Sequence, residues 1–134
     1  MGILGALRNL GSGRQEESDL WNQPQTISEI DDILNREVRP QVIYKHSYSC
    51  AVSMFAKSSL ESDLELAADK ADLHLIDVIA QRPLSNDIAE KTGVRHESPQ
   101  LLVIYNGDVF WSDSHGSVRI DKLLETLSEL ENAG

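Results

Sequence analysis

Helix-like and strand-like hydrophobic patterns alternate along this 134-residue chain, and their order limits the fold more than any other feature. Spacings of three and four residues indicate helices, whereas short β-branched or continuous apolar runs indicate strands. In chain order these patterns predict a helix at 26–37, a strand at 42–45, a helix at 50–70, a strand at 73–78, a helix at 85–90, strands at 101–105 and 109–111, and a helix at 117–130. The order α-β-α-β-α-β-β-α indicates an α/β domain in which a βαβ unit precedes a hairpin and a last helix.

Short local motifs predict where several of these elements begin and end. Thr26 followed by Glu29 fits a capping box, Ser85 is expected to cap the third helix, and Gly93 is expected to end it. Asn106-Gly107 between two apolar runs is a strong signal for a tight hairpin turn. The pair Ser58-Ser59 suggests a break in the second helix.

Two strands carry side chains whose direction follows from alternation. Trp111 and Phe110 are neighbours in a strand, so one should face the core and the other the opposite face of the sheet. His74 lies in the second strand and is expected on its solvent side.

The composition is that of one globular domain. Apolar residues make up 40% of the chain and charged residues 25%, close to ordinary usage, so global disorder is excluded. We expect residues 1–20 to form a flexible arm and linker and residues 21–134 to form the single domain. The net charge of -10 argues against nucleic acid and anionic membranes as partners. The opening apolar stretch fits neither a secretory signal nor a membrane span, so the cytoplasm is the expected compartment.

Cys50 is the one cysteine of the chain, which excludes an intramolecular disulfide and a cysteine-rich zinc cluster within one chain. It follows a strand and opens a helix, where the helix N-terminus stabilises a thiolate and lowers the thiol pKa. Lys45 and His46 are the nearest cations in sequence and would add to this effect if the loop directs them toward the sulfur.

Ser53 lies three residues after Cys50, so its hydroxyl could face the sulfur from one helical turn on. A second cysteine at that position would resolve a mixed disulfide within the chain. With Ser53 there, a disulfide formed at Cys50 must be released by a thiol from outside, which predicts monothiol exchange.

Ser98-Pro99 directly precedes the third strand, where a proline fits because it donates no ladder hydrogen bond. A cis bond at this place would turn the backbone groups of Ser98 outward and offer an extended ligand an edge for pairing beside Cys50. The alternative is a trans proline that only starts the strand.

Histidines in loops allow two further interpretations. His115, expected at the start of the last helix, could help to hold an anionic thiol ligand. His46, His96 and His115 could in principle form a metal site with Cys50, but no pair has convincing ligand spacing, and we expect no metal.

Taken together, several segments resemble the monothiol bacilliredoxin family of the thioredoxin superfamily over about 41–127, roughly two thirds of the chain. The matching segments are Lys45-His-Ser-Tyr-Ser-Cys-Ala-Val-Ser53, Ile76-Asp-Val78, Arg82-Pro-Leu-Ser-Asn86, Thr92-Gly-Val-Arg-His-Glu-Ser-Pro-Gln100, Asn106-Gly-Asp-Val-Phe-Trp111 and Ser114-His115. The resemblance implies a thioredoxin-like fold with a central four-stranded mixed sheet flanked by helices. It also implies an oxidoreductase without a bound cofactor that removes bacillithiol, its co-substrate, from S-thiolated proteins.

By this resemblance Cys50 is the nucleophile and transient bacillithiol carrier, and Pro99 is the cis-proline. Lys45, His46, Ser98 and His115 are the expected substrate-binding residues beside them. The family pattern is Thr-Cys-Pro-Ile-Ser, and in this chain Ala51 replaces the proline. A proline at the first helical position is pre-organised for the turn, so Ala51 should loosen the start of the helix slightly. A similar low-molecular-weight thiol could replace bacillithiol.

Two other classes remain open. One is an iron-sulfur cluster carrier of the monothiol glutaredoxin type, although this chain lacks the Cys-Gly-Phe-Ser turn of those proteins. The other is a redox-inactive binding module with the same fold, in which Cys50 is incidental. The sequence specifies no oligomeric state.

Overall fold

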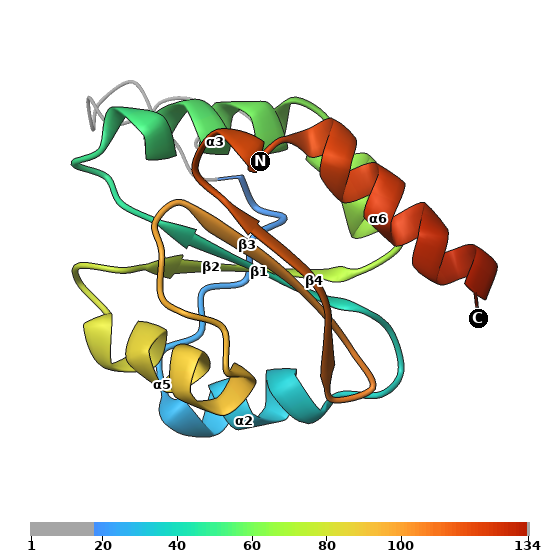
Figure 1. The fold of residues 1–134 in the computed structure, drawn as a ribbon, viewed down its shortest axis with the longest axis horizontal. Coiled ribbons are helices and arrows are strands. Elements are labelled where there is room, and N and C mark those ends of the chain that lie inside the picture. The colour runs from blue at the N-terminus through green and yellow to red at the C-terminus, as the bar shows by residue number, and fades with distance from the viewer. Residues whose placement is uncertain (1–17, 134) are drawn as a thin grey trace, which may run out of the picture.

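A four-stranded mixed sheet forms the centre of the computed structural model, which describes residues 18–133 (Figure 1). Its strands are Gln41–His46 (β1), Asp72–Asp77 (β2), Gln100–Tyr105 (β3) and Asp108–Ser114 (β4). The spatial order is β2-β1-β3-β4, with β1 parallel to β2 and antiparallel to β3, and β3 antiparallel to β4. The predicted mixed sheet is therefore confirmed.

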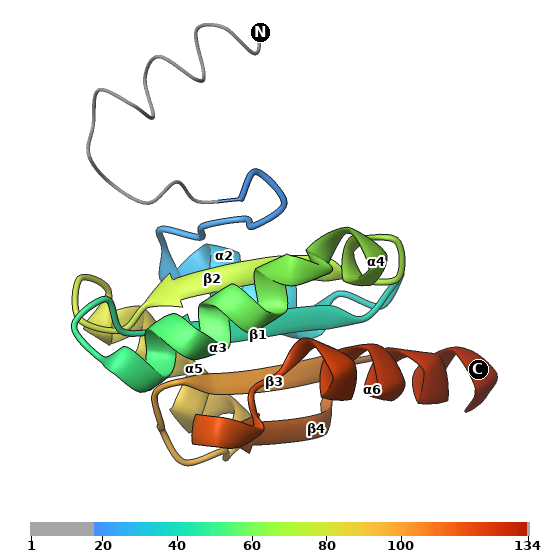
Figure 2. The same cartoon turned by 90° about the horizontal axis from the view of Figure 1, so that it is seen from above.

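Helices cover both faces of this sheet, as Figures 1 and 2 show. The helices α3, α4 and α6 lie over one face, and α2 and α5 lie over the other. Their bounds are Ile27–Asn35 (α2), Ala51–Ser62 (α3), Leu64–Ala68 (α4), Arg82–Thr92 (α5) and Ile120–Ala133 (α6), with a short 3-10 helix, η1, at His115–Ser117. This arrangement confirms the thioredoxin-like fold.

The central strand β1 is buried on both faces, and its side chains divide between two cores. Val42 and Tyr44 belong to the core beneath α3, α4 and α6, whereas Ile43 belongs to the core against α2 and α5. Trp111 packs partly buried against the first of these cores, as predicted for one of the two aromatic residues, whereas Phe110 is 44% exposed at a register shift, where simple alternation along β4 is interrupted.

Several predicted helix and turn signals are present. The Thr26 hydroxyl accepts a hydrogen bond from the Glu29 N–H at 3.1 Å, as a capping box requires. Gly93 ends α5 with a left-handed φ of 73°. Asn106 and Gly107 both have positive φ, at 53° and 84°, which suits the tight turn between β3 and β4.

Two predicted element ends are wrong. The second helix does not break at Ser58-Ser59 but at Asp63, and the Ser59 hydroxyl accepts from the Ile120 N–H in another segment of the chain. Ser85 does not cap the third helix, which already begins at Arg82 with a proline in its first turn. A proline fits there because the first helical N–H groups have no partner within the helix.

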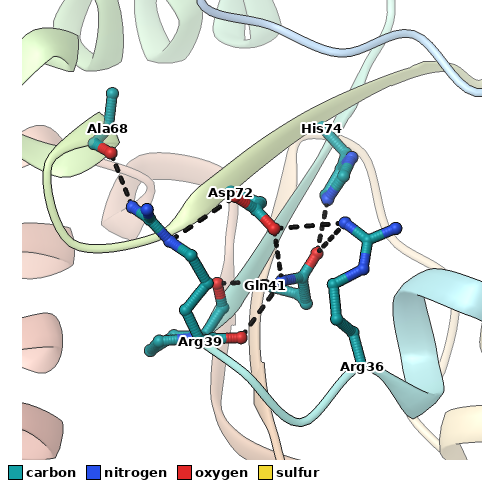
Figure 3. A network of polar contacts seen from close by, with 7 residues as sticks. Arg36, Arg39, Gln41, Ala68, Asp72 and His74 are labelled. Carbon is teal, nitrogen blue, oxygen red and sulfur yellow. Dashed lines mark hydrogen bonds and ion pairs between the residues drawn. The ribbon is translucent and has the colours of Figure 1, made fainter.

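His74 is not on a solvent side, since only 2% of it is exposed. Its Nε2 lies 2.8 Å from the Gln41 side-chain oxygen, and the Gln41 amide donates to Asp72 at 2.8 Å (Figure 3). Arg36 donates to the same Asp72 carboxylate at 3.1 Å. Asn22 pairs beside His74 in an isolated parallel bridge and helps to cover this outer strand.

The predicted arm at residues 1–20 lies mostly outside the described residues. Trp21 is 5% exposed, packs 5.7 Å from the Tyr44 ring and donates to Glu61 at 2.6 Å. The core therefore already includes Trp21. Within residues 18–133, no helix is both long and apolar enough to cross a membrane.

Candidate active site

Cys50 is the N-cap residue of α3, directly after the loop that follows β1. Its backbone is extended, with φ -117° and ψ 124°, and its carbonyl accepts from the Met54 N–H at 3.1 Å. The Cys50 N–H donates to the Ser47 carbonyl at 3.3 Å, which closes the preceding turn. The side chain is partly exposed. A nucleophile in this position can be reached from outside and lies at the positive end of the helix.

The surroundings lower the pKa of the Cys50 thiol below its ordinary value. The largest cause is the backbone N–H of Ser53, which donates to the sulfur. Partial burial acts in the opposite direction, while the Val52 N–H and the Ser53 hydroxyl lower the pKa further. Unpaired N–H groups in the first turn of a helix are natural donors to an anion, so the thiolate is favoured here.

Ser53 is fully buried, and both its backbone carbonyl and its backbone N–H have a partner. Its carbonyl accepts from the Tyr44 hydroxyl at 2.9 Å, while its N–H faces Cys50. Its own hydroxyl has no hydrogen bond of ordinary geometry to another described residue, so it is available to the thiolate. The sequence analysis identified Ser53 but not the contact of Tyr44 with it. The alternation of side chains along a strand does place Tyr44 and His46, two residues apart, on the same face of β1.

His46 is fully buried beneath the Cys50 loop and supplies no positive charge at neutral pH. Burial and the nearby Lys57 charge lower the pKa of His46 to about 4, against a weaker effect of Asp77 that raises it. Its Nδ1 lies 2.7 Å from the Tyr44 hydroxyl. Because that hydroxyl donates to Ser53, the histidine nitrogen is the donor and its Nε2 keeps a lone pair.

Lys45 points to the other face of the sheet, as expected for the neighbour of His46 in a strand. It is fully buried, and its Nζ donates to the Ser85 carbonyl at 3.0 Å and lies 3.4 Å from His96 Nδ1. Burial lowers the pKa of Lys45 to about 8. Neither Lys45 nor His46 is among the groups that shift the Cys50 pKa.

The Ser98-Pro99 bond is cis, and the loop that carries it lies at the same end of the sheet as Cys50 (Figure 1). The Ser98 backbone has no hydrogen bond to any of the described residues, and its buried hydroxyl has none either. The Pro99 carbonyl accepts from the His115 N–H at 2.9 Å, which ties this loop to the chain after β4.

His115 does not begin the last helix, contrary to the prediction. It lies in η1, with a left-handed φ of 57°, and α6 starts only at Ile120. Its side chain is 58% exposed, with Nε2 3.3 Å from the Glu97 carboxylate. The predicted role of the helix N-terminus is therefore lost, but the imidazole still lies beside the cis-proline loop.

Apolar side chains next to Cys50 are open to solvent. Tyr48 is 46% exposed and Val52 is 44% exposed, and Ile79, after β2 at the same end of the sheet, is 58% exposed. No group of three or more histidine, cysteine, aspartate or glutamate residues within 18–133 is placed to hold a metal ion.

Comparison with known proteins agrees with this geometry. A solved structure assigned as an oxidoreductase with a thioredoxin fold superposes with a TM-score of 0.71 at 28% identity, over 80% of this chain and 93% of the other. Thioredoxin from Trypanosoma brucei brucei superposes with a TM-score of 0.66 at 12% identity, over 89% and 98%. At 12% identity, the similarity to the trypanosome thioredoxin shows the fold alone.

The family comparison is more specific. The sequence model of the monothiol bacilliredoxin family matches residues 22–123, well over half of the chain, and this range includes Cys50, Ser53 and the cis-proline. The chain thus belongs to the monothiol bacilliredoxin family, and its domain is that of a thiol redox protein with the thioredoxin fold.

Proposed function

We propose that this protein is a monothiol thiol-disulfide oxidoreductase that removes bacillithiol, or a similar low-molecular-weight thiol, from protein mixed disulfides. Cys50 is the nucleophile and Ser53 its supporting residue. The other participants are S-thiolated proteins and the small thiol, in the cytoplasm, with no bound cofactor.

The observation that carries this proposal is the position of Cys50 as the N-cap residue of α3, where its sulfur faces the N–H groups of the first turn. The Ser53 and Val52 N–H groups favour the thiolate, and partial exposure leaves the sulfur within reach of a disulfide. A lowered thiol pKa increases the thiolate fraction near neutral pH, and the thiolate is the species that attacks disulfides.

In the first step, the Cys50 thiolate attacks the small-thiol sulfur of the mixed disulfide. A new S–S bond joins Cys50 to the small thiol, and the substrate sulfur leaves as a thiolate that takes a proton from water. The chain contains no second cysteine to attack Cys50 in return. A second molecule of small thiol therefore attacks the bound one, which regenerates Cys50 and releases the symmetrical small-molecule disulfide.

The test is intact mass spectrometry of the reduced protein after mixing with a bacillithiolated substrate protein. A glutathionylated substrate is run in parallel, and Cys50→Ser is the control variant. We expect one bacillithiol on the wild-type protein, release of the reduced substrate, little glutathione adduct and no adduct on Cys50→Ser.

Two results would contradict the proposal. Transfer that persists in Cys50→Ser would exclude Cys50 as the nucleophile. Absence of both adducts while Cys50 is demonstrably reduced would exclude the exchange reaction and favour the cluster carrier or the binding module.

A further inference from the structure

Two buried side chains of β1, Tyr44 and His46, connect the sheet to the first turn of α3. They alternate with Lys45 and point to the face of the sheet that α3 covers (Figure 1). The Tyr44 hydroxyl donates to the Ser53 carbonyl at 2.9 Å, and His46 Nδ1 lies 2.7 Å from the same hydroxyl. Tyr44, His46 and Ser53 are each 0% exposed. A chain of two hydrogen bonds therefore leads from His46 through Tyr44 to Ser53, and it is closed to solvent.

The protons in this chain have one arrangement. The Ser53 carbonyl can only accept, so the single hydroxyl proton of Tyr44 is committed to it, and His46 Nδ1 must donate to the hydroxyl oxygen. Burial and the charge of Lys57 act against a second proton on the imidazole more strongly than Asp77 favours it, so the ring is neutral. Donation into a hydroxyl oxygen strengthens the hydrogen bond that this hydroxyl donates in turn. His46 thus reinforces the bond from Tyr44 to Ser53.

The groups that stabilise the Cys50 thiolate are neutral donors whose direction matters. The Ser53 N–H is the largest cause of the lowered thiol pKa, and the Val52 N–H and the Ser53 hydroxyl add to it. No charged side chain is among the causes that shift this pKa within the described residues. A hydrogen bond weakens steeply as its angle departs from linearity. The stability of the thiolate therefore depends on how the first turn of α3 is oriented toward the sulfur.

The local sequence restrains that orientation only loosely. Ala51, the first residue of α3, fixes its backbone less than a proline would. The turn before the helix is closed by a long hydrogen bond of 3.3 Å from the Cys50 N–H to the Ser47 carbonyl. By contrast, the bond from Tyr44 to Ser53 is short and buried and comes from the central strand of the sheet. The sheet thus supplies a firm restraint on the residue whose N–H faces the sulfur.

We infer that Tyr44 and His46 are positioning residues for Cys50: the Tyr44 hydroxyl, held by His46, fixes the Ser53 carbonyl and so keeps the Ser53 N–H directed at the sulfur. Neither side chain is among the groups that act directly on the thiol, so both act through Ser53. The importance of this positioning for exchange rests on the proposed function, because it sets how much of Cys50 is thiolate near neutral pH.

The test is the pH dependence of Cys50 alkylation by iodoacetamide in the full-length protein. This profile gives both the thiolate fraction and the rate at which the thiolate itself reacts. Tyr44→Phe removes the hydroxyl and keeps the ring. We expect its alkylation rate below the thiol pKa to fall about fivefold, the size of effect that one hydrogen bond gives, while the rate at high pH changes less than about twofold. Tyr105→Phe, the same change at the other end of the sheet, should leave the profile unchanged.

Substitutions of His46 test the same chain of hydrogen bonds from its other end and leave Tyr44 in place. His46→Leu removes the donor to the Tyr44 hydroxyl and should lower the alkylation rate below the thiol pKa about twofold. In the Tyr44→Phe background it should have no further effect, because His46 acts through the hydroxyl. His46→Asn, whose amide N–H lies near the position of Nδ1, should recover most of the loss.

Three results would overturn this inference. One is a wild-type profile in Tyr44→Phe. The second is an equal change in Leu130→Ala, a cavity variant on α6 in the same core, because any loosening of that core would then produce the effect. The third is a loss in the double variant equal to the sum of the single losses, which would show that His46 does not act through Tyr44.

The proposed function is tested separately, because alkylation requires no disulfide substrate. A wild-type protein that shows the expected alkylation profiles but forms no adduct with either mixed disulfide would contradict the exchange reaction. The same result would support the roles of Tyr44 and His46 in the acidity of the Cys50 thiol.

Discussion

The charged side chains at the two ends of the paired strands β1 and β2 differ in burial and in their partners, because Arg36, Arg39 and Asp72 are partly exposed at one end and Lys45 is buried at the other. At the amino end, the Asp72 carboxylate lies 3.1 Å from Arg36 and 3.5 Å from Arg39 and accepts from Gln41 (Figure 3). At the carboxyl end, the Lys45 ammonium is fully buried, and its contacts among residues 18–133 are the neutral Ser85 and His96. One end neutralises its charges, and the other leaves a buried cation without a carboxylate.

Neutral groups differ less sharply between the two ends. Buried neutral side-chain atoms without a hydrogen-bond partner among the described residues include His46 Nε2, Ser98 Oγ and Gln100 Oε1 at the Cys50 end and His74 Nδ1 on β2. Unsatisfied buried groups reduce stability, and they persist where function requires them. We therefore expect the Asp72 network to contribute to folding but not to exchange, and the buried Lys45 cation at the carboxyl end to reduce stability. The following predictions test this contrast.

Acid should weaken both ends, because each contains a buried neutral histidine, His46 or His74. Burial is the main cause that lowers both pKa values from 6.5 to about 4. Between pH 6.5 and 4 the unfolded chain binds more protons than the folded one, so stability falls as the pH falls. Each histidine should contribute up to about 3 kcal/mol to this loss.

Urea unfolding at a series of pH values measures this effect. His74→Gln should reduce the slope of stability between pH 4 and 6.5 by up to one proton while leaving exchange at pH 7 unchanged. An identical slope in wild type and variant would show that His74 does not titrate in this range.

Asp72→Ala should lower the free energy of unfolding by about 2 kcal/mol, because Arg36, Arg39 and Gln41 lose their common acceptor. Chemical denaturation measures the loss, and the rate of exchange should not change. The matched control is Asp121→Ala in an exposed pair with Arg119, where we expect less than about 0.5 kcal/mol. Equal losses of stability in the two variants would show that the Asp72 network contributes no more than an exposed ion pair.

Lys45→Met should have the opposite sign and raise the stability at pH 7 by about 1 kcal/mol, because it removes a buried cation that no carboxylate balances. Burial lowers the pKa of Lys45 from 10.5 to about 8, so wild-type stability should rise between pH 8 and 10.5 as the folded ammonium loses its proton first. Thermal unfolding at pH 7 and pH 9 compares the two proteins. A destabilised variant would show that the ammonium is needed for packing.

Ala51→Pro should raise stability by about 0.5 kcal/mol, because Ala51 is the first residue of α3 and a proline there restricts the unfolded chain. The extended backbone of Cys50 already suits the residue before a proline. Denaturation with urea measures the gain. A decrease in stability would mean that the loop from β1 requires an unrestricted residue at this position.

Ser53→Ala should raise the pKa of the Cys50 thiol, and we expect this to be the smallest effect. The main cause of the lowered pKa is the Ser53 backbone N–H, which alanine retains, whereas the hydroxyl is a lesser one. The pH dependence of Cys50 alkylation measures the pKa directly. An unchanged profile would show that the Ser53 hydroxyl does not affect the Cys50 pKa.

The sequence predicted the order of elements and the fold because hydrophobic spacing and turn residues act locally, as at Thr26 and Asn106-Gly107. It misplaced the start of α5, because both Ser85 and the earlier Arg82-Pro83 are acceptable helix openings. It placed His74 on the wrong side because the cover comes from Asn22, far away in the sequence.

For the candidate site, alternation shows that Lys45 and His46 point to opposite faces but not which face lies nearer the sulfur. The contact between Lys45 and His96 joins residues 51 positions apart and exists only after the sheet has formed. Local spacing therefore identifies Cys50 and Ser53 as candidates, whereas the contacts of Lys45, His46 and His96 come from tertiary packing.

The isolated bridge between Asn22 and His74 has a consequence for association between molecules. β2 is an outer strand, and the unpaired edge of such a strand is a template for pairing with another chain. The Asn22 N–H donates to the Leu73 carbonyl at 2.8 Å, and the Asn22 carbonyl accepts from the Leu75 N–H at 2.9 Å. The short segment before α2 thus occupies part of the exposed edge and protects the protein against edge-to-edge aggregation.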